Sequence, residues 1–162
     1  AAAPLQAEFQ DSLDEELEME LDDARMDGLI ARAEGGVQRL HGLERRVRTV
    51  LSNVYGGLGE RRYDIIVSNL PYVPTVDVDA LPPEYRHEPR LGLESGGDGL
   101  NAVRALLAGA AAHLQPRGLL VVEVGDTAAN VQGAWPDVPF LWLEFERGGG
   151  GVFLLTREQL VA

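Results

Sequence analysis

Cysteine and lysine are both absent from this chain of 162 residues. Without cysteine the chain can form no disulfide and no metal or redox site built from thiolates. Without lysine all 14 strong bases are arginine, which fits the codon bias of a GC-rich bacterial genome. No apolar run is long enough for a membrane helix, and the N-terminal residues lack the basic-then-apolar order of a signal peptide. We therefore expect a cytoplasmic protein without a membrane partner.

The acidic charge is concentrated near one end of the chain. Residues 1–27 hold ten acids against one arginine, a net charge of −9, whereas the other 135 residues hold 16 acids and 13 arginines. A protein this acidic lacks the positive surface that neutralises phosphates, so direct recognition of nucleic acid is not expected. A basic protein partner suits the charge better, although a solvated acidic face is the commoner explanation of such a run. We divide the chain into an acidic helical segment, 1–27, and a domain, 28–162.

Hydrophobic periodicity predicts an α/β fold, in a chain of single-domain length. The apolar cores of two expected strands, IIV and LLVV, are hydrophobic on both faces, as in central parallel strands covered by helices. A proline-rich stretch, 71–97, has no clear period and is expected to be a functional loop or disordered. The order of elements predicts a mostly parallel sheet that ends in an antiparallel hairpin. We expect helices over 8–24 and 28–41, from Asp98 to before Pro116, and over 126–134, and strands over 46–51, 63–69 and 119–125, then a hairpin that turns at the glycines 148–151.

A polar tetrapeptide follows the strand predicted at 63–69. Asn69, Leu70, Pro71 and Tyr72 stand at its carboxyl end, where open α/β sheets bind ligands. The Asn69 side-chain oxygen and the carbonyl of residue 70 can each accept one N–H bond of a planar amide or amine, and Tyr72 can pack on its flat face. Such a grip orients a nitrogen toward an electrophile without acid–base chemistry. A strand followed by a proline turn explains the same four residues without any ligand.

Longer stretches of the chain carry a family resemblance. The tetrapeptide resembles the Asn-Pro-Pro-Tyr signature of S-adenosylmethionine-dependent methyltransferases that act on amide or amino nitrogens. Residues 81–100 (LPPEYRHEPRLGLESGGDGL), 119–126 (LLVVEVGD) and 135–160 (WPDVPFLWLEFERGGGGVFLLTREQL) are similar to the HemK-like N(5)-glutamine methyltransferases. The similarity is greatest to the branch that methylates a glutamine of large-subunit ribosomal protein L-three, and it covers residues 43–162.

The resemblance implies a fold, a cofactor and a set of site residues. It implies a Rossmann-like sheet that binds S-adenosylmethionine, with 28–162 as part of the catalytic domain. Asn69 and Leu70 would hold the glutamine amide of a ribosomal protein, and Pro71 and Tyr72 would complete that pocket; Asn69 and Tyr72 would be the catalytic side chains. Asn53 stands where the family has a residue, usually Asp, that contacts the cofactor adenine, and Asn69 would also border the cofactor. No metal and no general base are implied, because the methyl donor's sulfonium is already activated.

Two departures from the family bear on activity. The family has Pro in place of Leu70, but the hydrogen-bonding atom there is a backbone carbonyl. The change therefore removes only the restriction that a proline ring places on φ. The glycine-rich cofactor loop, Asp/Glu-x-Gly-x-Gly-x-Gly, and the acid for the ribose have no clear counterpart. The sheet is therefore expected to be incomplete in its N-terminal half, with an unpaired edge beside residues 65–67. The alternative to an enzyme is a truncated or degenerate relative that acts at most as a binding module.

Two further positions stay open. His87, in EYRHEP, is a single histidine and is weak evidence for a metal site, so a loop-ordering role next to the substrate is favoured for its neighbours Arg86 and Glu88. Glu123 suits either the active cleft or a buried structural carboxylate. Methylation of adenine in nucleic acid is disfavoured by the acidic charge and by the downstream similarity.

Overall fold

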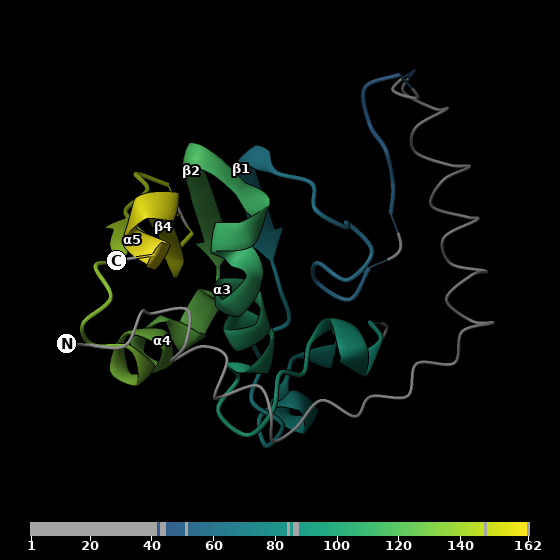
Figure 1. Cartoon of the computed structure of the whole chain (residues 1–162). Helices are drawn as coiled ribbons and strands as arrows, with labels where there is room; N and C mark the ends of the chain where they lie inside the picture. The colour runs from purple at the N-terminus through teal and green to yellow at the C-terminus, as the bar shows by residue number, and fades with distance from the viewer. Residues whose placement is uncertain are drawn as a thin grey trace. The chain divides into compact units, whose positions relative to one another are not determined.

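The structure is a computed structural model that describes residues 42, 45–50, 52–83, 85, 88–147 and 149–161 (Figure 1). The chain divides into two compact units, and the described residues up to Gly59 belong to one unit while those from Glu60 onward belong to the other. The helices predicted over 8–24 and 28–41, and the domain boundary predicted at residue 27, lie outside the described residues. None of the helices in the described part is long and apolar enough to cross a membrane.

The described part of the unit that ends at Gly59 consists of extended chain and turns. Residues 47–50 form no strand, so the strand predicted over 46–51 is wrong in its described part. Every strand of the described sheet comes from later residues. The following turn is closed by a hydrogen bond from the Gly56 N–H to the Asn53 carbonyl, 3.0 Å.

The unit that begins at Glu60 contains a four-stranded sheet in the order β1-β2-β4-β3. β1 (Tyr63–Asn69) pairs in parallel with β2 (Leu114–Glu123), β2 pairs antiparallel with β4 (Val152–Thr156), and β4 pairs antiparallel with β3 (Leu141–Leu143). The α/β class and the terminal hairpin are confirmed. The prediction of a mostly parallel sheet is wrong for these strands, because the hairpin supplies two of the three pairings.

The helices of this unit are α3 (Asn101–His113), α4 (Ala128–Ala134) and α5 (Arg157–Val161), with short 3₁₀ turns at Val78–Ala80, Arg90–Gly92 and Gly125–Thr127. α3 begins three residues later than predicted. The Asp98 carboxylate accepts the N–H of Leu100, which precedes the helix, and not an N–H of the first helical turn. β2 begins earlier than predicted: Leu114 pairs with Tyr63, and the pairing then skips to Leu119. Arg117 in this irregular stretch has φ 64°.

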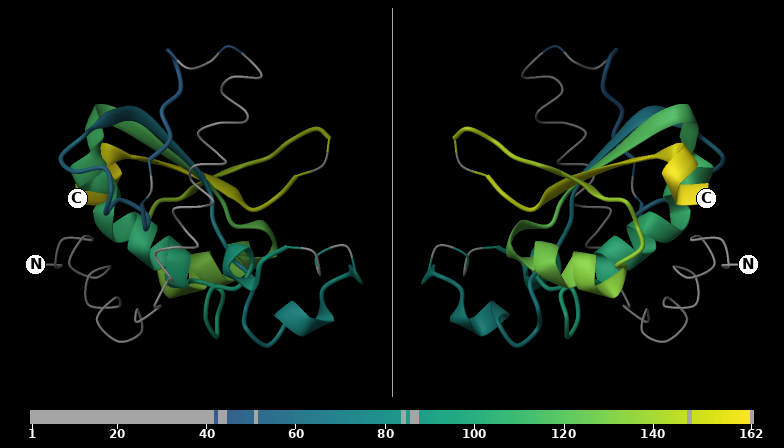
Figure 2. Two further views of the ribbon diagram at one scale, coloured as in Figure 1. Left: turned by 90° about the vertical axis from the view of Figure 1, so that its right-hand side faces the viewer. Right: turned by 90° about the vertical axis from the view of Figure 1, so that its left-hand side faces the viewer.

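The core lies between α3, α5 and one face of β2 and β4, and Figure 2 shows α3 and α5 side by side. Leu120 pairs with Leu155 and Val122 pairs with Phe153 across the β2–β4 ladder, and all four side chains are fully buried. The sequence prediction of a buried strand is therefore confirmed for this face of β2.

β1 is different, because it ends the described sheet. Val67 is 76% exposed and Ile65 is 58% exposed, while Ile66 between them is half-buried. The expected unpaired edge beside residues 65–67 is confirmed for the described strands. The prediction that β1 is covered on both faces is wrong, since only the face of Ile66 is turned toward the core.

Candidate functional site

The end of β1 opens into a cavity of about 480 Å³. Three parts of the chain line it: the residues just after β1, the loop that follows them, and the turn after β2. The lining residues are Asn69, Leu70, Pro71, Tyr72, Val73, Pro74, Asp77, Leu81, Tyr85, Glu88, Gly92, Leu93, Asp126 and Thr127. The four residues of the tetrapeptide thus lie together in one concave site, at the carboxyl ends of two parallel strands.

Asn69 is the last residue of β1, where it pairs with Glu123 of β2. Its side chain is exposed, and no described residue forms a hydrogen bond with its amide group. An exposed amide at the mouth of a cavity can accept and donate hydrogen bonds to a guest without first breaking an internal bond. The geometry is therefore suited to holding a planar amide.

The wall of the cavity beyond Tyr72 is fixed by a short ladder. The Val73 N–H donates to the Leu93 carbonyl at 2.8 Å, and the Ser95 N–H donates to the Val73 carbonyl at 2.9 Å. The Thr75 N–H then donates to the Gly96 carbonyl at 2.9 Å. These bonds tie the chain after the tetrapeptide to residues 93–96, so the proline-rich loop is an ordered element along this stretch.

Tyr72 is packed against glycines that leave no room for a side chain. A Cβ on Gly125, which has φ +49°, would lie 2.7 Å from the Tyr72 ring and 2.9 Å from its hydroxyl oxygen. A Cβ on Gly99, which has φ +77°, would lie 2.4 Å from the Tyr72 carbonyl oxygen. On the other side of Gly125, the Val124 N–H donates to the Gly151 carbonyl at 2.7 Å. The turn after β2 and the loop before α3 therefore set the position of the tyrosine.

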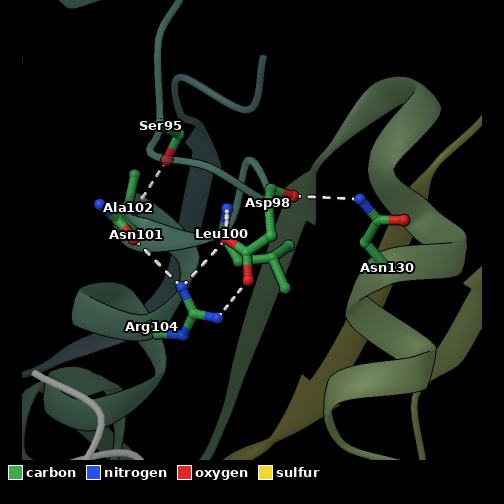
Figure 3. Close-up of polar contacts among 7 residues, drawn as sticks. All are labelled: Ser95, Asp98, Leu100, Asn101, Ala102, Arg104 and Asn130. Atoms are coloured by element: carbon green, nitrogen blue, oxygen red, sulfur yellow. Dashed lines mark hydrogen bonds and ion pairs between the residues drawn. The ribbon is translucent and has the colours of Figure 1, made fainter. Parts of the chain in front are cut away.

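The loop before α3 is held by the network drawn in Figure 3. Arg104 forms an ion pair with the Asp98 carboxylate and donates to the Asn101 side-chain oxygen at 3.1 Å. Asn130 of α4 donates to the Asp98 carbonyl at 3.0 Å, and the Ser95 hydroxyl accepts the Ala102 N–H at 2.9 Å. The network joins α3 and α4 to the loop that contacts Tyr72. Arg104 and the Leu100 N–H lower the pKa of Asp98.

The electrostatic environment of Tyr72 is negative. Burial raises the pKa of its hydroxyl, and the nearby Glu123, Tyr85, Asp126 and Glu88 raise that pKa further. The tyrosine is therefore a neutral donor or packing surface at physiological pH, and it is not a base.

The structure brings some of the predicted residues together and leaves others apart. Asn69, Leu70, Pro71 and Tyr72 line one cavity. Asn53 belongs to the unit that ends at Gly59, and its contact with a cofactor stays a prediction. Arg86 and His87 lie outside the described residues, whereas their neighbour Glu88 is described and lines the cavity.

Sequence reasoning missed the acids Asp77 and Asp126 of the cavity. A signal for Asp126 was present, because it follows the strand LLVVEV and the carboxyl ends of adjacent parallel strands share one edge of a sheet. Asp77 had no such signal, since its position depends on the path of an irregular loop. Among the described residues no group of three acids or histidines is placed to hold a metal ion.

The described residues fit an amide substrate better than they fit a whole methyl donor. No closely spaced run of glycines directly follows β1 or β2, where a cradle for a nucleoside-type cofactor is expected. The described runs at 56–59 and 96–99 do not directly follow a strand. Gly149, Gly150 and Gly151 lie in the loop that leads into β4, and Gly99 and Gly125 are used to pack Tyr72. What the cavity offers chemically is orientation of a planar polar group.

Comparison with known proteins found curated relatives but no matching family model and no matching solved structure. The ribosomal protein uL3 glutamine methyltransferases of Neisseria meningitidis serogroup A and Neisseria gonorrhoeae are each 51% identical over 121 residues, which is 75% of this chain and 40% of the relative. The protein of the same name from Francisella tularensis subsp. tularensis is 41% identical over 135 residues, 83% of this chain and 43% of the relative. The chain thus spans about two fifths of the length of these relatives.

Proposed function

We propose that this chain, which is 51% identical over about three quarters of its length to ribosomal protein uL3 glutamine methyltransferases, carries the substrate site for methylation of a glutamine side chain in a ribosomal protein. S-adenosylmethionine is the proposed methyl donor, and the sheet is proposed to be the C-terminal part of a Rossmann-like methyltransferase domain that starts near residue 28. The proposed location is the cytoplasm, where ribosomal proteins are made. Neither nucleic acid nor a membrane is a proposed partner.

The observation that carries this proposal is the cavity at the end of β1. It unites Asn69, Leu70, Pro71 and Tyr72, the residues that the resemblance assigns to the glutamine pocket. The amide of Asn69 has no hydrogen bond to a described residue, so it is available to a substrate amide. The neutral Tyr72 is packed on Gly125 and presents a flat surface for such a group.

The proposed chemistry is orientation of a weak nucleophile. The two N–H bonds of the glutamine amide would be accepted by the Asn69 side-chain oxygen and by the Leu70 carbonyl, and Tyr72 would pack on the face of the amide. A neutral amide nitrogen attacks slowly unless it is held in line with the electrophile, and positioning of this kind can lower a barrier by several kcal/mol. S-adenosylmethionine, when bound, supplies an activated methyl group, so the protein needs no strong base. Asn53 is proposed to contact the adenine.

Substitution of Asn69 by Ala tests the proposed hydrogen bond between its side chain and the glutamine amide. We expect Asn69→Ala to abolish methylation of the ribosomal protein while it leaves the affinity for the methyl donor largely unchanged, as measured by transfer of labelled methyl and by calorimetry. Leu70→Ala is the matched control, because it keeps the backbone carbonyl and should keep the activity. Full activity of Asn69→Ala would refute the role given to this side chain.

The second candidate is a binding module that holds the substrate segment without transferring a methyl group. It is favoured by the lack of a glycine run directly after β1 or β2. Calorimetric titration of the purified chain with S-adenosylmethionine and with its demethylated product separates the two candidates. If millimolar concentrations of both ligands release no heat, this chain is not an enzyme by itself.

A further inference from the structure

The cavity at the end of β1 has acids on its rim and no described cation in its lining. Asp77 and Glu88 come from the loop after Tyr72, and Asp126 comes from the turn after β2. All three are exposed, and none forms an ion pair with a described residue. The acids therefore approach the tetrapeptide from two separate parts of the chain.

Three other acids nearby form ion pairs with arginine. Arg90 pairs with Asp79 at 2.7 Å and with Glu94 at 3.2 Å, and Arg104 pairs with Asp98. None of these five residues lines the cavity. Three carboxylates without a described ion pair thus lie around the cavity. The negative field reaches Tyr72, whose pKa is raised first by burial and then by Glu123, Tyr85, Asp126 and Glu88.

We propose that Asp77, Glu88 and Asp126 select a glutamine that is flanked by basic residues, so that the cavity recognises a positively charged segment of protein. This inference rests on the proposed function, because the grip of Asn69 on the glutamine defines where the segment sits. An extended segment advances about 3.3 Å per residue, so arginine or lysine side chains within a few positions of the glutamine can reach the rim. Exposed rim charges of this kind accelerate association and set specificity.

A cationic methyl donor, like a basic segment, has a positive charge that the three acids can attract. The exposure of all three acids favours the segment, because rim carboxylates are open to long side chains that approach from solvent. The two sources are separated by titrating each ligand into the same variants.

The test measures binding of labelled synthetic peptides to the full chain by fluorescence anisotropy. One peptide has a central glutamine with arginine and glycine neighbours, the second has serine in place of the arginines, and the third has the arginines but alanine in place of the glutamine. The pocket variant combines Asp77→Asn, Glu88→Gln and Asp126→Asn. The control variant combines Asp137→Asn, Glu144→Gln and Glu146→Gln, three exposed acids outside the cavity, and it changes the net charge by the same amount.

We expect the basic glutamine peptide to bind the pocket variant about tenfold more weakly than the wild-type chain, and the control variant as tightly as the wild-type chain. Added salt should weaken binding to the wild-type chain and have a smaller effect on the pocket variant. Circular dichroism of both variants checks that they are folded.

Three results would overturn the inference: equal effects of the pocket and control variants, equal affinity of the wild-type chain for the arginine and serine peptides, or no binding of the basic peptide. A pocket variant that loses affinity for S-adenosylmethionine but keeps it for the peptide would assign the acids to the cofactor, and would also overturn it. Failure of the proposed function looks different: the alanine peptide would then bind as tightly as the glutamine peptide, and Asn69→Ala would leave both unchanged.

Discussion

β1 and β2 have similar apolar cores and opposite environments. Ile65, Ile66 and Val67 of β1 pair in register with Leu119, Leu120 and Val121 of β2. Leu120 is fully buried whereas its partner Ile66 is half-buried, and Val67 is 76% exposed whereas its partner Val121 is half-buried. The difference does not come from composition, because both runs are made of aliphatic residues.

The two strands differ in burial because they differ in the number of strands that pair with them. β2 lies between β1 and β4 and is covered by α5 and α3 on one face, whereas β1 has β2 as its one partner in the described sheet. The stability of this unit therefore resides on the β2–β4 side, and β1 contributes mainly through its end, where Asn69 lines the cavity. Four substitutions test this division.

The largest expected effect is from Phe153→Ala in β4. Phe153 is fully buried and packs edge-on against Phe140 and Trp142, with ring centroids 4.8 and 5.5 Å away. Loss of a buried aromatic ring lowers the free energy of unfolding by about 3–5 kcal/mol, measurable by chemical denaturation. A loss below about 1 kcal/mol would place the core elsewhere.

Gly151→Ala should have the next largest effect. A Cβ at this position, with φ +65°, would lie 2.0 Å from the Gly125 carbonyl oxygen, so both the backbone strain and the clash oppose it. We expect the free energy of unfolding to fall by about 2–3 kcal/mol. Gly150→Ala is the control, because a Cβ there meets no atom within 4 Å, and a similar loss for both variants would contradict the close approach.

Asp98→Asn should have a smaller effect that depends on pH. The folded pKa of Asp98 is lowered, first by the hydrogen bond from Arg104, so its contribution is present above the ordinary carboxyl pKa of about 4 and is lost as the pH falls through the folded value. Because the side chain is 45% exposed, we expect a loss of about 1 kcal/mol at neutral pH. Thermal unfolding at several pH values measures it.

The control for Asp98 is Asp137→Asn, at an exposed residue without a described ion pair. It should leave the unfolding free energy within about 0.5 kcal/mol of the wild-type value at neutral pH. A difference between Asp98→Asn and the wild-type chain that grows as the solution becomes more acidic would contradict the stated direction.

The smallest expected effect is from Val67→Thr in β1. This exposed side chain tolerates a hydroxyl, so the free energy of unfolding should change by less than about 0.5 kcal/mol. The same change at Val122 of β2, which is fully buried, should lower the free energy of unfolding by about 2 kcal/mol, because the buried hydroxyl loses its hydrogen bonds to water. Equal losses at the two positions would remove the distinction between the strands.

Much of the fold of the unit that begins at Glu60 could be predicted from its sequence. Local periodicity predicted β1, α3, α4 and the terminal hairpin, because strand and helix patterns depend on residues close together in the chain. The start of α3 was predicted too early, since Asp98 binds Arg104 and the Leu100 N–H in a turn before the helix. The strand predicted over 46–51 is wrong in its described part, where residues 47–50 form no strand.

The candidate site could be predicted only in part. Asn69 and Tyr72 were recognisable because they follow a strand in a motif that is short and continuous. Asp77 was not placed in the cavity, since a loop without period leaves the path of the chain open. The packing of Tyr72 on Gly125 joins residues far apart in sequence, and no local pattern reports such a contact.

The sequence by itself determined the class of elements, the polar tetrapeptide at the end of β1 and the family relationship, because each rests on the order of neighbouring residues. Only the tertiary structure decided that Leu120 is buried while Val67 is exposed, and that acids from two parts of the chain surround the cavity. Burial and electrostatic field are properties of what lies beside a residue in space. Two similar apolar stretches therefore acquire different roles, because β2 pairs with two strands of the described sheet and β1 pairs with one.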